Sequence, residues 1–170
     1  MSKLILLALS LIAASGIATA EAAAQYRVTI TNISPGQTFT PLLVATHSAK
    51  YELFSPGQPA REALAILAEG GDTAPLGAEL AGVSTEVTTI PGLLGPGESA
   101  SITVEGMPAA DVLSVAAMLI PTNDTFMALA SVRLPRVGSF THQVPAYDAG
   151  TEANDQDCHN IPGPRCAGEG

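Results

Sequence analysis

Hydrophobic and polar residues alternate along several short segments of the chain, and turn-forming residues separate these segments. Residues 26–32, YRVTITN, place Tyr26, Val28 and Ile30 on one face and polar side chains on the other. A period of two residues is typical of a strand with one buried face. Similar patterns predict further strands at 41–47, 83–90, 99–105, 126–134 and 139–144. Residues 112–120, VLSVAAMLI, are nearly all apolar and predict a central strand, although periodicity alone does not distinguish it from a buried helix.

Residues 60–69 break this pattern and predict one short helix. Small and apolar residues recur there at helical spacing: Ala60, Ala63, Leu64, Leu67 and Ala68. Pro59 precedes the first turn and Gly70 follows the last, as is common at helix ends. About seven or eight strands and one helix predict an all-β fold, an antiparallel β-sandwich with one short helix.

The first twenty residues have the organisation of a secretory signal peptide. Lys3 precedes an apolar run from Leu4 to Ala14, and Ala18-Thr19-Ala20 forms a small-x-small cleavage pattern. The apolar run is too short to span a bilayer. We therefore expect a signal peptide at 1–20, cleavage near Ala20 and one domain at 21–170. The expected location is secreted, either extracellular or periplasmic.

The charge of the chain narrows the classes of partner. Without Lys3, six Lys and Arg face sixteen Asp and Glu, so the net charge of the mature chain is −10. Such an acidic surface argues against nucleic acid and against electrostatic docking on anionic lipid. It suits cation binding or simple solubility. No later segment is long and apolar enough to span a membrane.

The two cysteines, Cys158 and Cys166, enclose the sequence CHNIPGPRC. In an exported chain we expect them to form a local disulfide that closes an acidic C-terminal tail, although their spacing does not require this pairing. His159 alone does not supply the further ligands that a zinc site would need.

Residues 144–158, VPAYDAGTEANDQDC, carry four acidic residues and no Lys or Arg: Asp148, Glu152, Asp155 and Asp157. Such a segment is either solvated or binds a cation. A turn at Gly150 would bring Asp148 and Glu152 to one point, and Asp124 would complete the site if both loops meet at one end of the sandwich. Calcium prefers several oxygen ligands on flexible loops and would relieve the repulsion between carboxylates. The spacing is not that of an EF-hand.

The sequence predicts no enzyme. It contains no G-x-S-x-G motif, and His47, His142 and His159 lack the spacing of a metal-binding histidine pair. Catalytic triads and carboxylate pairs are recognised by geometry, so an exported hydrolase remains an alternative.

Three segments resemble the spondin domain, the N-terminal module of F-spondin and mindin: IPTNDTF at 120–126, YDAGTE at 147–152 and AEGGDTAPL at 68–76. The likeness covers roughly residues 26–155 and is greatest to stand-alone exported bacterial members. It implies a C2-like sandwich with Ca²⁺ at one end, held by Asp124, Asp148 and Glu152. Glu152 departs from the family, whose animal members have Asp there. Thr125 replaces an aromatic residue, and Phe126 is expected to take over its packing role.

Together these features predict a secreted calcium-binding spondin-like module without catalytic activity. Because the animal relatives act in adhesion, the expected role is adhesion or recognition at the cell surface or in the matrix, with an unidentified protein or glycan as partner. The alternatives are an exported hydrolase and a metal-free structural envelope protein whose acidic loop is solvated.

Overall fold

The computed structural model describes residues 22–155 and 157–162; the expected signal peptide lies outside them. Within the described residues the chain forms two antiparallel sheets and two short helices, which confirms the predicted all-β sandwich. In chain order the elements are β1 (Ala24–Thr31), β2 (Thr38–Phe39), β3 (Leu42–Ser48), α1 (Glu62–Gly70), α2 (Ala74–Ala81), β4 (Ser84–Ile90), β5 (Ser99–Gly106), β6 (Asp111–Ile120), β7 (Thr125–Arg133) and β8 (Ala146–Asp148).

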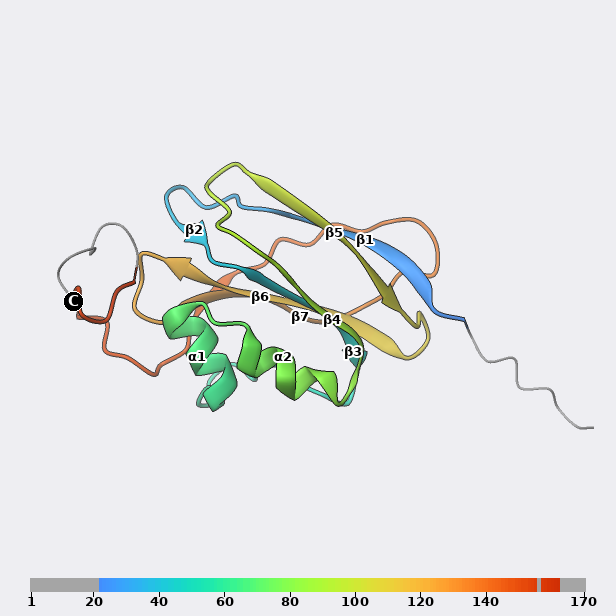
Figure 1. Cartoon of the computed structure of the whole chain (residues 1–170), viewed down its shortest axis with the longest axis horizontal. Helices are drawn as coiled ribbons and strands as arrows, with labels where there is room; N and C mark the ends of the chain where they lie inside the picture. Colours follow the sequence, from blue (N-terminus) through green and yellow to red (C-terminus); the bar gives the residue numbers. More distant parts are fainter. Residues whose placement is uncertain (1–21, 156, 163–170) are drawn as a thin grey trace, which may run out of the picture.

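The two sheets and the helices form layers (Figure 1). Strands β1 and β5 pair with each other in a two-stranded sheet. The larger sheet has the order β4-β3-β6-β7-β8, and β2 pairs with β6 beside this path. Both helices lie on the face of the larger sheet that is turned away from β1 and β5. The central strands of this sheet are therefore covered on both faces.

The core consists of two apolar layers, one on each face of the larger sheet. Strand β3 supplies both, because Leu42 and Val44 face the β1–β5 sheet whereas Leu43 and Ala45 face the helices. All ten positions of β6 are buried, as expected for a central strand. Burying a leucine side chain stabilises a fold by about 1.5–3 kcal/mol. Because β3 and β6 bury apolar side chains on both faces of the sheet, they form the rigid centre of the domain.

Helix α1 confirms the predicted helix, and its side chains Ala63, Leu64, Leu67 and Ala68 are buried as expected. The prediction of a single helix was wrong, because α2 follows almost at once. Its sequence, APLGAELA, contains a proline and a glycine, and only Leu76 and Leu80 mark a buried face. Gly77 lies where a Cβ atom would be 3.6 Å from side chains of both Leu43 and Val87. Packing against the sheet thus stabilises a helix that its own sequence signals weakly.

The predicted strand at 139–144 was also wrong. This segment lies outside the strands and is largely exposed, with Phe140 at 41% exposure in contact with the His142 ring. The alternation of Phe140, His142 and Val144 is real, but no neighbouring strand pairs with it in the described residues. The last strand is instead β8, which pairs with the start of β7.

Three aromatic rings fill the core where β7 and β8 meet. Phe126 is 2% exposed, lies 5.3 Å from the Phe54 ring and stacks on the Tyr147 ring at 5.6 Å. Phe126 therefore has the packing role expected for it.

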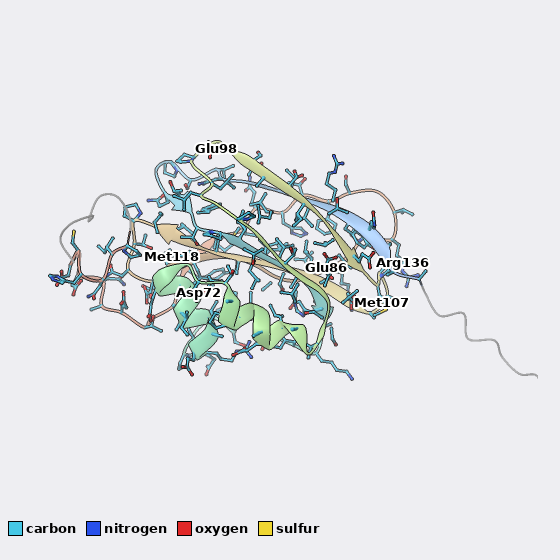
Figure 2. All side chains as sticks on the ribbon, in the orientation of Figure 1. Asp72, Glu86, Glu98, Met107, Met118 and Arg136 are labelled. Carbon is cyan, nitrogen blue, oxygen red and sulfur yellow. The ribbon has the colours of Figure 1, made fainter. Side chains whose placement is uncertain are left out.

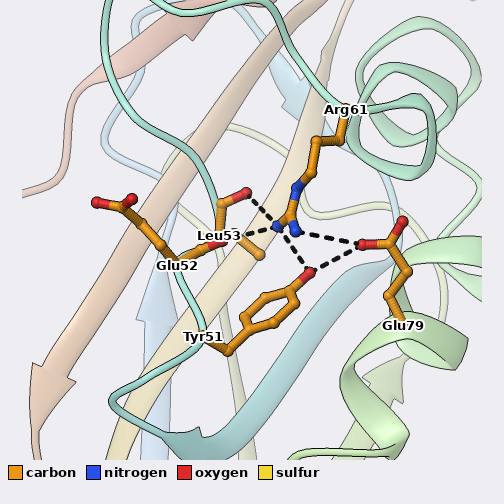
Figure 3. A network of polar contacts seen from close by, with 5 residues as sticks. All are labelled: Tyr51, Glu52, Leu53, Arg61 and Glu79. Atoms are coloured by element: carbon orange, nitrogen blue, oxygen red, sulfur yellow. Dashed lines mark hydrogen bonds and ion pairs between the residues drawn. The ribbon is translucent and has the colours of Figure 1, made fainter.

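A polar network holds the connection between β3 and α1 against the helices (Figure 3). Arg61 Nη2 donates to Tyr51 Oη at 2.8 Å and to the carbonyls of Glu52 and Leu53 at 2.7 and 3.1 Å. Glu79 of α2 accepts a hydrogen bond from Tyr51 Oη at 3.0 Å and pairs with Arg61 at 3.7 Å. One guanidinium thus links a loop to both helices.

His47 of β3 is fully buried and makes a hydrogen bond with each ring nitrogen. Nδ1 donates to the Ser48 carbonyl at 3.0 Å, so Nε2 accepts from Ser114 Oγ at 2.8 Å. Removal from water lowers the pKa of His47 below its ordinary value, although the Ser48 carbonyl and Asp111 act in the opposite direction.

The described part of the tail ends at residue 162. Cys158 is disulfide-bonded, and the other cysteine of the chain, Cys166, lies outside the described residues.

No helix in the described residues has the length and apolar character required to cross a membrane.

The network around Arg61 predicts a measurable contribution to stability. We expect Arg61→Met to lower the free energy of unfolding by about 1 kcal/mol, because the loop carbonyls lose a charged donor at a half-exposed site. Arg27→Met, on the outer face of β1, is the matched control and should change it by less than about 0.5 kcal/mol. Equal urea midpoints for the two variants would contradict a role for the network.

The lowered pKa of His47 predicts a stability that falls in mild acid. The unfolded chain takes up this proton near pH 6.5 and the folded chain only at lower pH, so the stabilisation is complete above about pH 6.5 and declines below it. One proton gives a slope of at most about 1.4 kcal/mol per pH unit. Urea melts between about pH 7 and pH 5.5 should show a smaller decline in His47→Gln than in the wild type, and His142→Gln should behave as the wild type. An equal decline in stability for the wild type and both variants would refute the role assigned to His47.

Candidate cation site

The two loops that carry the predicted ligands meet at one end of the sandwich. Asp124 directly precedes β7, and Asp148 is the last residue of β8. The two strands pair antiparallel with Thr125 opposite Asp148, so the turn after β6 lies beside the loop after β8. Met118, near the end of β6, lies toward this end of the molecule, whereas Glu86 and Met107 lie toward the other (Figure 2). The two loops therefore meet at one end of the sandwich, as the sequence analysis expected.

Asp124 organises the loop after β8. Its side chain is 0% exposed, and its Oδ2 accepts hydrogen bonds from the Thr151 and Glu152 amides at 2.8 and 3.1 Å. Thr151 Oγ1 donates to the same oxygen at 3.2 Å, and the Ala149 amide donates to the Asp124 carbonyl at 3.2 Å. A buried carboxylate needs such donors because its desolvation is costly.

Two carboxylate oxygens at this point lack a hydrogen-bond partner among the described residues. They are Asp124 Oδ1 and Glu152 Oε2, and both are buried. Leaving a buried acceptor unsatisfied costs about 1–3 kcal/mol, and more for a charged group. The neighbouring Asn123 Nδ2 is buried and unpartnered as well. Both oxygens therefore have the capacity to accept a hydrogen bond or a cation.

Asp148 lies on the same loop, but its carboxylate points to other partners. Oδ1 accepts the Gly150 amide at 2.7 Å, and Oδ2 accepts Asn154 Nδ2 at 2.7 Å. Gly150 has φ 70°, a left-handed conformation that glycine adopts without strain. The predicted turn at Gly150 thus exists. It brings Glu152 to Asp124, while Asp148 stays exposed at the edge of the loop.

The remaining acids of the loop have separate surroundings. Asp157 is exposed and accepts hydrogen bonds from the His159 amide and ring at 3.0 and 2.9 Å, which lower its pKa. Asp155 accepts the Asp157 amide at 2.9 Å. Among these four acids, only Glu152 has a buried side-chain oxygen without a hydrogen-bond partner, and its backbone amide donates to Asp124 Oδ2 at 3.1 Å.

The electrostatics of Glu152 reveal a residue to which the sequence analysis assigned no role. Partial removal from water raises the pKa of Glu152, and the nearby charges of Glu69, Asp124 and Asp155 raise it further. Glu69 belongs to the last turn of α1, within the AEGGDTAPL segment. An acid in the last helical turn without a basic neighbour was the sequence signal that could have identified it.

Calcium takes six to eight oxygen ligands in proteins. Asp124 Oδ1 and Glu152 Oε2 fit this requirement because they are unpaired oxygens on two adjacent loops. Asp148 retains lone pairs beyond those used in its two hydrogen bonds. Among residues 22–155 and 157–162, no three His, Cys, Asp or Glu side chains converge as a finished metal-binding group. The fit therefore rests on Asp124 and Glu152, and the full ligand set remains a prediction.

Two features of the described residues bear on the alternative of a hydrolase. Ser114 does contact His47, but the two side chains are 2% and 0% exposed, and Ser114 Oγ also accepts the Ser131 amide at 2.9 Å. A cavity of about 570 Å³ lies between the β1–β5 sheet and β4, and its lining includes Glu86 and Glu105. Glu86 is engaged there, because its carboxylate accepts the Glu105 amide. The Ser114–His47 pair is a structural feature of the core.

Comparison with known proteins agrees with this architecture. The sequence profile of the Spondin_N family, the N-terminal spondin domain, matches residues 24–156, which include both helices, all the strands described above and the two loops of the site. The family is a non-enzymatic domain family. A comparison with curated proteins gives no match. Because the match covers most of the chain, the chain belongs to the Spondin_N family.

Proposed function

We propose that the chain is an exported, non-enzymatic spondin module that binds Ca²⁺ at the end of its sandwich. The observation that carries this proposal is the fully buried Asp124, whose Oδ1 has no hydrogen-bond partner while its Oδ2 accepts the amide of Glu152, a residue whose own Oε2 is buried and unpaired. When bound, the ion would neutralise the clustered carboxylate charge. Asp124, Glu152 and Asp148 would hold it.

The chain itself prepares the site through the hydrogen bonds of Asp124. Three donors from Thr151 and Glu152 occupy one carboxylate oxygen and leave the other for a ligand. Thr125 pairs with Asp148, so the Asp148 carboxylate lies on the strand end beside the turn that carries Asp124. The ion's structural effect would be to hold the loop after β8 against the turn before β7.

Export is supported by features of the chain, whereas the adhesion role is proposed from the family membership alone. Residues 1–20 have the pattern of a signal peptide, and a disulfide at Cys158 suits an oxidising compartment. The Spondin_N domain suggests an extracellular protein. We propose adhesion or recognition at the cell surface or in the matrix, with a protein or glycan as partner. The metal-free envelope protein is the competing proposal, and it predicts that calcium does not change stability.

A thermal melt of the mature chain, with calcium and with chelator, tests the cation site. An ion that binds only the folded chain stabilises it by about 2.7 kcal/mol at a hundredfold excess over Kd. For a domain of this size, the corresponding rise in Tm is roughly 10 °C. Magnesium at equal ionic strength is the control and should give a smaller rise, because it loses its hydration water reluctantly. No rise with calcium, or equal rises with both ions, would overturn the proposal.

Two substitutions test the individual ligands. Asp124→Asn and Asp148→Asn each remove one negative charge and keep an acceptor for the loop amides, so we expect both to reduce the calcium-induced rise in Tm. Asp124→Asn should reduce it more, since Asp124 is the buried ligand. Glu62→Gln, exposed in the first turn of α1, removes the same charge elsewhere and should leave the rise unchanged. A wild-type rise in Asp148→Asn would exclude Asp148 from the ligand set.

A further inference from the structure

Strands β4 and β5 lie next to each other at one long edge of the sandwich, although they belong to different sheets (Figure 1). Each is the last strand of its sheet, β4 in the larger sheet and β5 in the two-stranded one. The outer edge of such a strand presents backbone amides and carbonyls that no strand of its own sheet uses. The cavity of about 570 Å³ described above lies between these two strands.

Side chains of the larger sheet occupy one position of the outer β5 edge. The Glu105 amide donates to the Glu86 carboxylate, and the Glu105 carbonyl accepts from Thr46 Oγ1 at 2.5 Å. Both backbone groups of Glu105 therefore point away from β1. The pair that Glu105 forms with Gln25 is thus one of the pairs of this ladder that exchange no backbone hydrogen bonds.

The backbone of Thr103 points in the same direction but has no such partners. Pairs with and without backbone hydrogen bonds alternate along an antiparallel ladder, so the pair of Arg27 with Thr103 also lacks them. The 2.8 Å contact between the Thr29 and Ser101 hydroxyls agrees, because side chains come closer in such pairs. No other described residue accepts from the Thr103 amide or donates to its carbonyl. Because Thr103 lines the cavity, a free donor and a free acceptor of a strand edge border it.

Two carboxylates without a counter-charge line the same cavity. Its lining consists of Gln25, Thr85, Glu86, Thr103, Val104 and Glu105. Neither Glu86 nor Glu105 forms an ion pair with another of the described residues. Four of the six lining residues are exposed, so the cavity is open to a partner. An acidic, open cavity beside a strand edge is complementary to a basic segment in an extended conformation.

We infer that this cavity is the docking site for a short extended segment of a partner protein that carries Lys or Arg. The segment adds to the β5 edge through the Thr103 amide and carbonyl, and its basic side chain pairs with Glu105 and the second oxygen of Glu86. A second copy of the chain fits poorly, because six basic residues face sixteen acidic ones in the mature chain and two copies repel each other. Glu86 lies toward the end of the molecule opposite the candidate cation site (Figure 2). The inference therefore gives the recognition role a partner class and does not depend on calcium.

Fluorescence anisotropy of the mature chain with a labelled, end-blocked hexapeptide, TKVKVT, tests the inference. The probe places both lysines on one face of an extended strand. Two control peptides separate its charge from its backbone: TEVEVT reverses the charge, and TKVKVT with N-methylated amides keeps the charge but cannot add to a strand edge. We expect the mature chain to bind TKVKVT at least about tenfold more tightly than either control, since a hydrogen bond to a charged group contributes about 1.5–3 kcal/mol.

Two pairs of variants locate the binding on the chain. Thr103→Pro removes the amide that borders the cavity and keeps the ladder with β1, to which this amide does not contribute. Thr29→Pro is the matched control, because the Thr29 amide is also outside this ladder but lies on the far edge of β1. Glu105→Gln and Glu62→Gln make the same comparison for charge, without a change of backbone. We expect Thr103→Pro and Glu105→Gln to weaken the Kd for TKVKVT by about tenfold, and the two controls to stay within about twofold of the wild type.

The outcomes distinguish docking at the β5 edge from attraction to the acidic surface as a whole. Weaker binding in Thr103→Pro and Glu105→Gln alone supports the inference, and if a proline variant does not fold, the glutamine pair decides. Equal binding of TKVKVT by the wild type and Glu105→Gln, or of TKVKVT and its N-methylated form, would overturn it. Absence of binding at millimolar peptide would do the same. The titrations should give the same result in calcium and in chelator, so a failure of the calcium proposal leaves this inference standing.

Discussion

Burial of the larger sheet on both faces is the constraint on which the rest of this structure depends. Strands β3 and β6 send alternate side chains into two separate apolar layers, one beneath β1 and β5 and one beneath the helices. The loss of apolar surface on both sides makes these strands the least movable part of the domain. Their register in turn determines where β7 begins and β8 ends, and hence where the loops of the candidate site meet.

The candidate site combines this rigid support with short, polar loops. Asp124 follows the cis-peptide turn after β6 and is fully buried, which requires donors for its charge. The loop after β8 supplies them through Thr151 and Glu152, so one carboxylate both shapes the loop and presents an unpaired oxygen. Under the proposed function, a bound cation would neutralise negative charge on Asp124 and Glu152. This arrangement differs from an acidic tail, whose charges are separated and solvated, as at Asp157.

The Ser114–His47 pair shows why contact between catalytic residue types is a poor guide to activity. Its hydrogen bond has a suitable length, but both side chains lie inside the sheet core, and the hydroxyl also serves the Ser131 amide at a β-bulge. Ser131 has φ 54°, so this bulge requires an unusual backbone conformation that the buried hydroxyl helps to satisfy. The pair therefore supports the fold, in keeping with a non-enzymatic domain family.

The sequence by itself determined the features that depend on periodicity. The alternation in β1, the apolar run of β6 and the stripe of α1 predicted their burial correctly, because side-chain direction follows directly from backbone geometry. The sequence also located the acidic loop and the turn at Gly150. Helix α2 and the absence of a strand at 139–144 were decided by tertiary packing, since one gains its stability from the sheet and the other lacks a partner strand. Tertiary structure alone decided which carboxylates share an environment. Asp124 and Glu152 lie on different loops and come together only through the pairing of β7 with β8, whereas Asp148 satisfies its carboxylate within its own loop.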